Sequence, residues 1–464
     1  MNKYSLRISG RHHDQLRRHL FPGDGLEAVA FALCGRNRTD EEHIFTVHKV
    51  VPVAYADCDR TPISVAWPTE ALAAILDDAR RQGLAVMKFH SHPEFFERFS
   101  KLDDESDAET FASVSAWLDD GEPHGSAVML PDGRVFGRAM TEGGEQAFSS
   151  VTVAGDKLSF WYQPGDCDPD FDGKLAAQLQ LFGSGTTARL RRLRIGVVGC
   201  SGTGSFVVEL LGRLAVGELV LIDDDRVEDR NLNRIVNAGE RHVGEYKVDV
   251  LKRAVEAMGL GTKVDAIPRN LYDPVCVKKI AHCDVVFGCM DTAEGRHLLN
   301  RIAAFYVQPY FDLGVHLLAD GEGGIDEASG VVHYLQPGGS SLFGRRAYTL
   351  EEVRAEGLRR TDPEAFQAER KAGYIEGADE KSPPVASLNC TIAGIAVNEF
   401  LSRLHPFRSC DPRDCDVVRF NFMETLTTKE SAPEECPLLA PHVGRGDVEP
   451  LLGWSSLSMR EVEP

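Results

Sequence analysis

The stretch from Ile195 to Arg234 decides the fold of the C-terminal part of the chain, and its sequence is IGVVGCSGTGSFVVELLGRLAVGELVLIDDDRVEDRNLNR. An apolar run enters a glycine-rich turn, Gly199 to Gly204, and leaves it as an amphipathic helix that we expect to begin near Ser205. A second apolar run, Glu218 to Ile222, ends in three aspartates. Because parallel strands end at one edge of a sheet, these carboxylates should lie beside the positive end of the helix. The pattern predicts a nucleotide site.

Two cations and a further carboxylate follow the aspartates. A glycine turn alone serves close packing in many proteins, but this one is followed by Arg234, Lys247 and Asp291. Cleavage of ATP between its α and β phosphates requires cations that neutralise phosphate charge and a carboxylate that holds magnesium. These three residues supply both, so the sequence indicates phosphate chemistry.

The order of these motifs resembles the ThiF, MoeB and HesA family, relatives of the ubiquitin-activating enzymes. The family pattern is a glycine loop ending in serine, an Asp-x-Asp strand end, Asn-Leu-x-Arg, a lysine and Cys-x-Asp. In this chain the pattern is met at Gly199–Ser205, Asp223 and Asp225, Asn231–Arg234, Lys247 and Cys289–Asp291. The resemblance implies a Rossmann-like fold that binds ATP and transfers AMP to the C-terminal glycine of a small carrier protein.

The resemblance also implies roles for individual residues. Nucleotide binding falls to the loop glycines Gly199, Gly202 and Gly204 and to the acids Asp223 and Asp225. Asp223 would hold the ribose. The phosphates would meet Asn231, Arg234 and Lys247, and magnesium would lie at Asp291.

Some positions depart from the family pattern. Ser201 replaces the second glycine and narrows the approach of the nucleotide to the backbone by one small side chain. The arginine that reaches the ATP of the partner subunit is absent, since Ala177-Gln178 occupies its place. The sequence holds no CxxC pair for the family's structural zinc, of which Cys436 is a remnant, so we expect that zinc to be absent.

A second motif, HSHPEFFERFSKLD, runs from His90 to Asp103. His-x-His at the end of a predicted strand places both imidazoles on one face, because side chains alternate with period two. A lone His-x-His is more often a polar turn. With Asp103 added, His90 and His92 complete a three-ligand zinc set whose fourth position is open to water, as catalytic zinc requires.

The spacing of these ligands resembles the JAMM motif of MPN-domain metallopeptidases, which include the prokaryotic JAB proteins. The resemblance implies that Glu27, at the start of an apolar strand, is the general base and that Ser100 donates a hydrogen bond to the oxyanion. The bond cut in the family is a peptide or isopeptide bond after the C-terminal glycines of a ubiquitin-like protein. We expect Asp104 and Asp107 to be helix-start or solvated carboxylates and not ligands.

Composition and charge exclude several classes. The 464 residues, 43% hydrophobic and 26% charged, suffice for two or three globular domains. A net charge of -20 argues against nucleic acid as a partner. We find no signal segment or membrane-spanning run, and the eleven cysteines show no paired spacing. We therefore expect a cytoplasmic chain that contacts no membrane.

We predict an α/β chain of two domains. Residues 1–145 form an α+β MPN domain, 146–170 a connector, and 171–464 a ThiF-type domain with a mostly parallel sheet. A helix is expected in the first domain from Ala108 to Asp119. By resemblance, a crossover segment at 338–385 passes over the substrate tail.

The crossover segment holds no cysteine that forms a thioester. The nearest is Cys390, where Asn389 would cap a helix whose dipole activates the thiol. The alternative, which we favour, is a small side chain packed in an apolar helix. Cys410 and Cys415 lie in a polar loop, and we expect them to be ordinary.

Together the two resemblances imply a bifunctional protein of a bacterial-type ubiquitin-like or sulfur-carrier system. It would use ATP with Mg²⁺ to adenylate a carrier and Zn²⁺ to cleave after the carrier tail. The partners would be a small ubiquitin-like or sulfur-carrier protein ending in glycine, a conjugating enzyme or thiol acceptor, and a second copy in a homodimer. Two alternatives stay open: sulfur-carrier activation with product release in small-molecule biosynthesis, and a scaffold with one inactive site.

Overall fold

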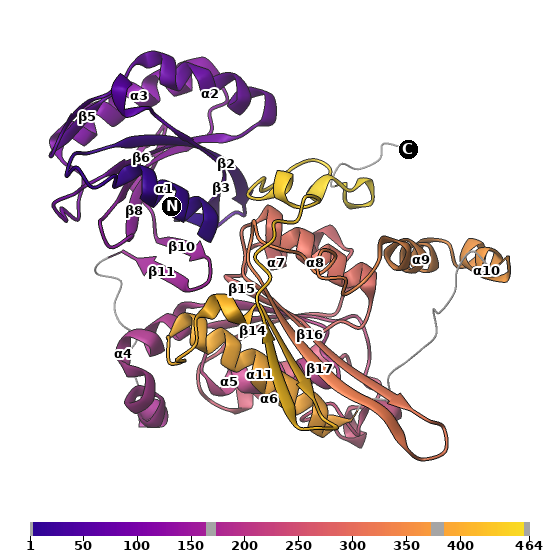
Figure 1. Cartoon of the computed structure of the whole chain (residues 1–464). Helices are drawn as coiled ribbons and strands as arrows, with labels where there is room; N and C mark the ends of the chain where they lie inside the picture. Colours follow the sequence, from indigo (N-terminus) through magenta and orange to yellow (C-terminus); the bar gives the residue numbers. More distant parts are fainter. Residues whose placement is uncertain (1–2, 164–172, 373–384, 459–464) are drawn as a thin grey trace. The chain divides into compact units, whose positions relative to one another are not determined.

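The computed structural model describes residues 3–163, 173–372 and 385–458, and the chain divides into two compact units (Figure 1). The first unit comprises Met1–Cys167, Ala304–Val307 and Ala440–Gly453. The second comprises Asp168–Ala303, Gln308–Leu439 and Trp454–Pro464. Among the helices of the described ranges, none combines the length and apolar character that crossing a bilayer requires.

A nine-stranded mixed sheet forms the first unit, in the order β11-β10-β1-β3-β2-β6-β7-β8-β9. Its strands are β1 Lys3–Ser9, β2 Val29–Arg38, β3 Glu42–Pro52, β6 Ala85–Ser91, β7 His124–Met129, β8 Val135–Thr141, β9 Gly144–Ala147, β10 Ser150–Ala154 and β11 Leu158–Tyr162. The helices are α1 Gly10–Leu20, α2 Thr69–Gln82 and α3 Lys101–Leu118, and β4 Asp59–Thr61 pairs with β5 Ser64–Ala66.

The two faces of this sheet bury separate cores. On β6, Val86 lies in the core that includes α2 and α3, whereas Met87 and Phe89 lie in the opposite core with α1. Because side chains alternate along a strand, Lys88 and His90 share the face of Val86. Polar side chains of β6 therefore point toward α3.

Helix α3 begins earlier than predicted. It starts at Lys101 and not at Ala108, because Ser100 and Asp103 form a capping box at its N-terminus. Asp103 thus lies in the first helical turn.

Residues 146–170, expected as a connector, contain two strands. β10 pairs in parallel with β1 and antiparallel with β11, which adds both to the first sheet. Residues 164–170 of that range lie outside the described part. The range 171–464 also includes two segments, 304–307 and 440–453, that group with the first unit. The domain ranges themselves stay predictions.

The second unit contains an eight-stranded sheet in the order β14-β13-β12-β15-β16-β17-β18-β19. Its strands are β12 Arg194–Val198, β13 Glu218–Ile222, β14 Lys263–Ile267, β15 Val285–Gly288, β16 Tyr310–Ala319, β17 Ile325–Leu335, β18 Val417–Asn421 and β19 Leu426–Glu430. The helices are α4 Ala176–Arg192, α5 Gly202–Arg213, α6 Lys247–Ala257, α7 Pro274–Ala281, α8 Ala293–Phe305, α9 Leu350–Thr361, α10 Pro363–Lys371 and α11 Ala386–Leu404.

The first five strands of that order run in parallel, and β17 to β19 continue the sheet antiparallel. The predicted neighbours β12 and β13 pair in parallel, with Val198 beside Ile222. Their carboxyl ends therefore meet at one edge, where the glycine turn and the aspartates follow. Of the predicted crossover segment, residues 373–384 lie outside the described part.

Candidate metal centre and nucleotide cleft

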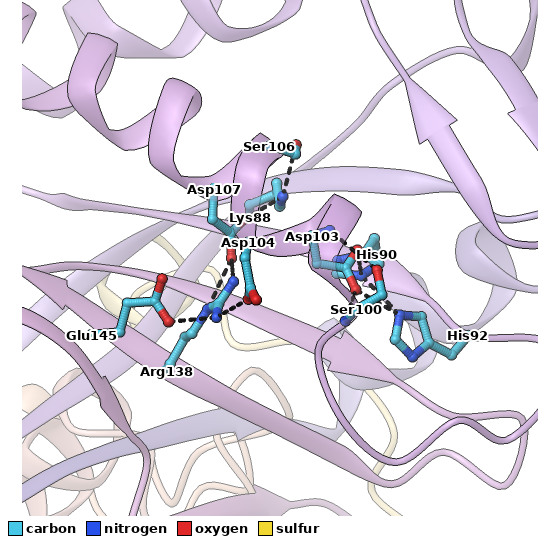
Figure 2. A network of polar contacts seen from close by, with 10 residues as sticks. All are labelled: Lys88, His90, His92, Ser100, Asp103, Asp104, Ser106, Asp107, Arg138 and Glu145. Carbon is cyan, nitrogen blue, oxygen red and sulfur yellow. Dashed lines mark hydrogen bonds and ion pairs between the residues drawn. The ribbon is translucent and has the colours of Figure 1, made fainter.

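Three polar side chains of the first unit converge on one point. His90 Nε2 lies 3.1 Å from His92 Nε2 and 3.0 Å from Asp103 Oδ1, and His92 Nε2 lies 3.4 Å from Asp103 Oδ2. Figure 2 shows the two imidazoles and the carboxylate pointing toward one another, His90 from β6, His92 from the residue after that strand, and Asp103 from the start of α3. All three candidate ligand atoms lie within 4.8 Å of one another. The structure thus brings together the predicted zinc ligands.

The chemistry of this donor set suits zinc. His92 Nδ1 donates to the Phe96 carbonyl at 2.7 Å, which leaves the lone pair of Nε2 facing the centre. Burial lowers the pKa of His90, whereas at His92 burial is outweighed by the hydrogen bonds to Asp103 and Phe96 and by the charge of Asp103, which raise the pKa; a neutral imidazole is the form that binds a metal. Two imidazoles and one carboxylate leave a fourth tetrahedral position for water.

Glu27 lies beside this centre. Val29 of β2 pairs with His90 in antiparallel register, and Ser91 N donates to the Ala28 carbonyl at 3.1 Å, so continuation of the register places Glu27 next to His92. Its side chain is buried. Burial raises the pKa of Glu27 to about 7, although the charge of His92 opposes the shift. A carboxyl group that titrates near neutrality is suited to proton transfer.

Ser100 has a structural role that leaves its hydroxyl proton available. Its Oγ accepts from Asp103 N at 3.2 Å, and Asp103 Oδ2 accepts from Ser100 N at 2.6 Å. A hydroxyl that accepts one hydrogen bond still carries its O–H donor. The predicted hydrogen bond to an oxyanion is compatible with this cap.

A buried charge cluster, which we define as Lys88, Asp107 and Arg138, lies next to the predicted metal ligands (Figure 2). Lys88 Nζ forms an ion pair with Asp107, and Arg138 donates to Asp107 Oδ2 from Nε at 3.0 Å and from Nη2 at 2.6 Å. Arg138 also pairs with Asp104 at 2.6 Å. Asp107, expected as a helix-start or solvated carboxylate, is completely buried. The sequence did not predict the burial of Asp107, because its partners Lys88 and Arg138 come from two strands, β6 and β8.

A large cleft of about 2490 Å³ lies in the second unit at the carboxyl edge of its parallel strands. The predicted residues that line it are Gly199, Gly202, Asp223, Asp225, Asn231, Arg234, Lys247 and Asp291. Of the predicted nucleotide residues, only Gly204 does not line it. Residues separated by more than ninety positions in the chain therefore share one cleft.

The glycine turn is tight for steric reasons. Gly199 has a φ of +88°, and a Cβ there would lie 2.6 Å from the Cys289 carbonyl oxygen. A Cβ on Gly204 would lie 1.8 Å from the Gly199 carbonyl oxygen, so Gly204 serves packing. Helix α5 begins at Gly202, earlier than the predicted Ser205. Its first N–H groups have no acceptor within the helix and can bind an anion.

Asp223, which follows the neighbouring strand β13, forms a hydrogen bond to the glycine turn. Its Oδ2 accepts from Cys200 N at 2.6 Å, and its Oδ1 accepts from Asp225 N at 2.9 Å. Lys247 Nζ lies 2.6 Å from Asp225 Oδ2 and 3.9 Å from Asp223 Oδ1. Burial raises the pKa of Asp223, against the charge of Lys247. Each carboxylate oxygen accepts two hydrogen bonds, so Asp223 retains capacity for ribose hydroxyls.

The remaining predicted groups, Asn231, Arg234 and Asp291, also line the cleft. Asn231 is buried and its Oδ1 accepts from Glu228 N at 3.0 Å, which shapes the turn that presents Arg234. Burial and the charge of Arg230 lower the pKa of Arg234, and the carboxylate of Asp291 opposes them. Asp291 is exposed between β15 and α8, where its oxygens are open to a cation.

Two further groups belong to this cleft. Arg296 lines it and pairs with the fully buried Asp312 at 3.4 Å. Asn389 also lines it, and its Oδ1 accepts from Thr203 Oγ1 at 3.3 Å. Helix α11 begins at Ala386, so Asn389 is not its cap, and Cys390 is exposed and not packed as expected. The amphipathic pattern did not reveal these contacts: Thr203 and Asn389 are 186 residues apart, and Arg296 and Asp312 come from different elements, α8 and β16.

Comparison with known proteins gives two family matches. A model described as the ThiF family matches residues 174–438, and a model described as prokaryotic homologs of the JAB domain matches residues 9–136. The second match covers the candidate metal centre, and the first covers the nucleotide cleft.

Three curated relatives resemble parts of the chain. Ubiquitin-like modifier-activating enzyme 5 of Bombyx mori is 28% identical over 166 residues, 33% of this chain and 40% of that protein. Adenylyltransferase and sulfurtransferase MOCS3 of Mus musculus is 35% identical over 121 residues, 26% of each chain. SAMP-activating enzyme E1 of Haloferax volcanii is 32% identical over 117 residues, 25% of this chain and 43% of that protein. The chain thus spans less than half of each relative.

Among solved structures, E. coli MccB with ATP matches with a TM-score of 0.45 and 18% identity, over 60% of this chain and 76% of that chain. A similarity at this level supports no statement about function.

Proposed function

Since the chain belongs to the ThiF family, we propose that its second unit adenylates the C-terminal glycine carboxylate of a small ubiquitin-like or sulfur-carrier protein. The observation that carries the proposal is the convergence of the glycine turn, Asp223, Lys247 and Asp291 on one cleft. The named relatives that activate ubiquitin-like modifiers or SAMP give the substrate class.

In this reaction each group of cleft residues has a separate role. The start of α5 binds the phosphates through its N–H groups, and Asp223 accepts from the ribose. A carboxylate oxygen of the carrier glycine forms a bond to the α phosphorus, the bond between the α and β phosphates breaks, and pyrophosphate leaves. Arg234 and Lys247 neutralise the charge that develops on the phosphates. Asp291 would hold magnesium, which when bound shields the phosphate oxygens.

We propose that the first unit cleaves the peptide or isopeptide bond after the same carrier tail. His90, His92 and Asp103 would hold zinc, which when bound lowers the pKa of its water and polarises the scissile carbonyl. Glu27 takes the proton of the attacking water and returns it to the leaving amine. Ser100 donates a hydrogen bond to the oxyanion. Both reactions act on the same C-terminal glycine, so one carrier protein is the substrate of both units.

ATP–pyrophosphate exchange with a β-grasp carrier ending in Gly-Gly tests the adenylation proposal. We expect carrier-dependent exchange in the wild type and a loss of about a hundredfold or more in Lys247→Ala, the scale of a removed transition-state contact. Lys252→Ala, a partly exposed lysine of the same helix, is the matched control and should retain exchange. Wild-type exchange in Lys247→Ala, or exchange that ignores the carrier, contradicts the proposal.

A further inference from the structure

Two cysteines remote in sequence from both sets of predicted site residues form a close pair. The Sγ atoms of Cys410 and Cys415 lie 3.7 Å apart, across the short turn Pro412–Cys415. Cys410 is partly exposed and Cys415 is buried. A disulfide has an S–S distance of about 2.05 Å, so an approach of about 1.7 Å would join them. Neither residue lines the nucleotide cleft.

The ammonium group of Lys429 contacts the sulfur of Cys410, the more exposed cysteine of the pair. Lys429 Nζ, on β19, lies 3.3 Å from Cys410 Sγ. An adjacent ammonium group stabilises a thiolate, which is the reactive form of cysteine. The hydrogen bond from Lys429 lowers the pKa of Cys410, whereas burial raises the pKa of Cys415. The pair therefore consists of an accessible, activated sulfur and a buried thiol beside it.

Hydrogen bonds hold the backbone at Cys415, the buried cysteine of the pair. Buried Arg403 donates from Nη2 to the Cys415 carbonyl at 2.9 Å, and Arg345 donates from Nη1 to the Asp416 carbonyl at 2.9 Å. Tyr334 N donates to the same Asp416 carbonyl at 2.9 Å. Closure of the pair therefore requires Cys410 to move toward Cys415, from a loop that follows the end of α11.

We infer that Cys410 and Cys415 are a peroxide-reactive pair that forms a reversible disulfide. The Cys410 thiolate attacks hydrogen peroxide: an S–O bond forms, the O–O bond breaks, and hydroxide leaves and takes a proton to become water. The Cys415 thiol then loses its proton and its sulfur attacks Cys410: the S–S bond forms, the S–O bond breaks, and a second water leaves. The two thiols supply the two electrons that reduce the peroxide, and a thiol reductant restores them.

Peptide mapping of the full chain after exposure to hydrogen peroxide tests this inference. Trypsin cuts after Arg408, Arg413 and Arg419, so the disulfide joins peptides 409–413 and 414–419 into one species that a reductant separates. We expect this linked species in the wild type. In Cys415→Ser we expect a sulfenic acid on Cys410 that dimedone traps, and in Cys410→Ser we expect no label on Cys415.

Two comparisons test whether Cys410 reacts because Lys429 activates its sulfur or only because the sulfur is exposed to solvent. Cys390 is more exposed than Cys410, so it would react first if exposure alone set the rate. We expect Cys410 to react first, and Lys429→Met to slow its oxidation by about threefold to tenfold. Preferential oxidation of Cys390 would overturn the inference, as would a sulfenic acid on Cys410 that never becomes the linked species. An unchanged rate in Lys429→Met would remove the role of the lysine.

Discussion

Lys88 and Asp107 form an ion pair in which both charged groups are buried. Lys88 precedes His90 by two residues on β6, and Asp107 follows Asp103 by one turn on α3. The alternation of a strand and the turn of a helix thus place this pair beside the predicted metal ligands. We infer that it holds α3 at the position where Asp103 meets the histidines.

Asp107→Asn should destabilise the first unit by about 3 to 5 kcal/mol, because it leaves the buried Lys88 without its carboxylate. Asp104→Asn is the matched control, since Asp104 also pairs with Arg138 but is half exposed, and it should cost about 1 kcal/mol or less. Urea-induced unfolding of the full chain measures both. Equal losses of unfolding free energy in the two variants would contradict the expectation that the buried Lys88–Asp107 pair stabilises the first unit more than the exposed Asp104 pair does.

Glu27→Gln should retain bound zinc and lower the rate of tail cleavage by about a hundredfold or more, the scale of a lost general base. Glu94→Gln, an exposed glutamate of the neighbouring loop, is the control and should keep the wild-type rate. Metal analysis and cleavage of a carrier-terminal peptide give the two readouts. An unchanged rate in Glu27→Gln would assign the proton transfer to another group.

The stability of the second unit should fall as pH drops from about 6.5 to 4, in part because of His297. Burial and the charge of Arg301 lower the pKa of His297 to about 4, so the unfolded chain binds this proton first. The loss amounts to about 3 kcal/mol when pH has passed through both pKa values. His297→Gln should remove that share of the loss, measured by urea unfolding at several pH values. His316→Gln, at an exposed histidine, should not change it.

No thioester between enzyme and carrier should form at Cys390. Although this thiol is exposed, its neighbour Asn389 lines the nucleotide cleft and Cys390 does not, so we expect the sulfur not to reach an adenylate bound there. A non-reducing gel of enzyme, ATP and carrier should therefore show no thiol-sensitive adduct. An adduct that disappears in Cys390→Ser, and persists in Cys410→Ser and Cys415→Ser, would refute this prediction.

Local patterns predicted much of this molecule. The α/β class and both family resemblances are confirmed by the matches at residues 9–136 and 174–438. The parallel pairing of β12 with β13 followed from two apolar runs, and the shared face of His90 and His92 followed from strand alternation. Each of these features depends on residues that are close in the sequence.

Other features depend on contacts between distant segments. The burial of Asp107 requires Lys88 and Arg138 from two strands, and no pattern within α3 indicates them. The pairing of β10 with β1 joins residues about 145 apart, so no local pattern showed that this part of the expected connector extends the first sheet. The early start of α3 was predictable, since Ser100 and Asp103 have capping-box spacing, but the helix was expected only from Ala108.

The central claim is that this chain carries two separate catalytic sites, and a crossed measurement of two variants tests it most directly. Bound zinc and ATP–pyrophosphate exchange are measured in His92→Ala and in Asp291→Ala. We predict that His92→Ala loses zinc and retains wild-type exchange, whereas Asp291→Ala retains zinc and loses exchange at every practical magnesium concentration. Loss of both properties in either variant, or wild-type exchange in Asp291→Ala, would contradict the account.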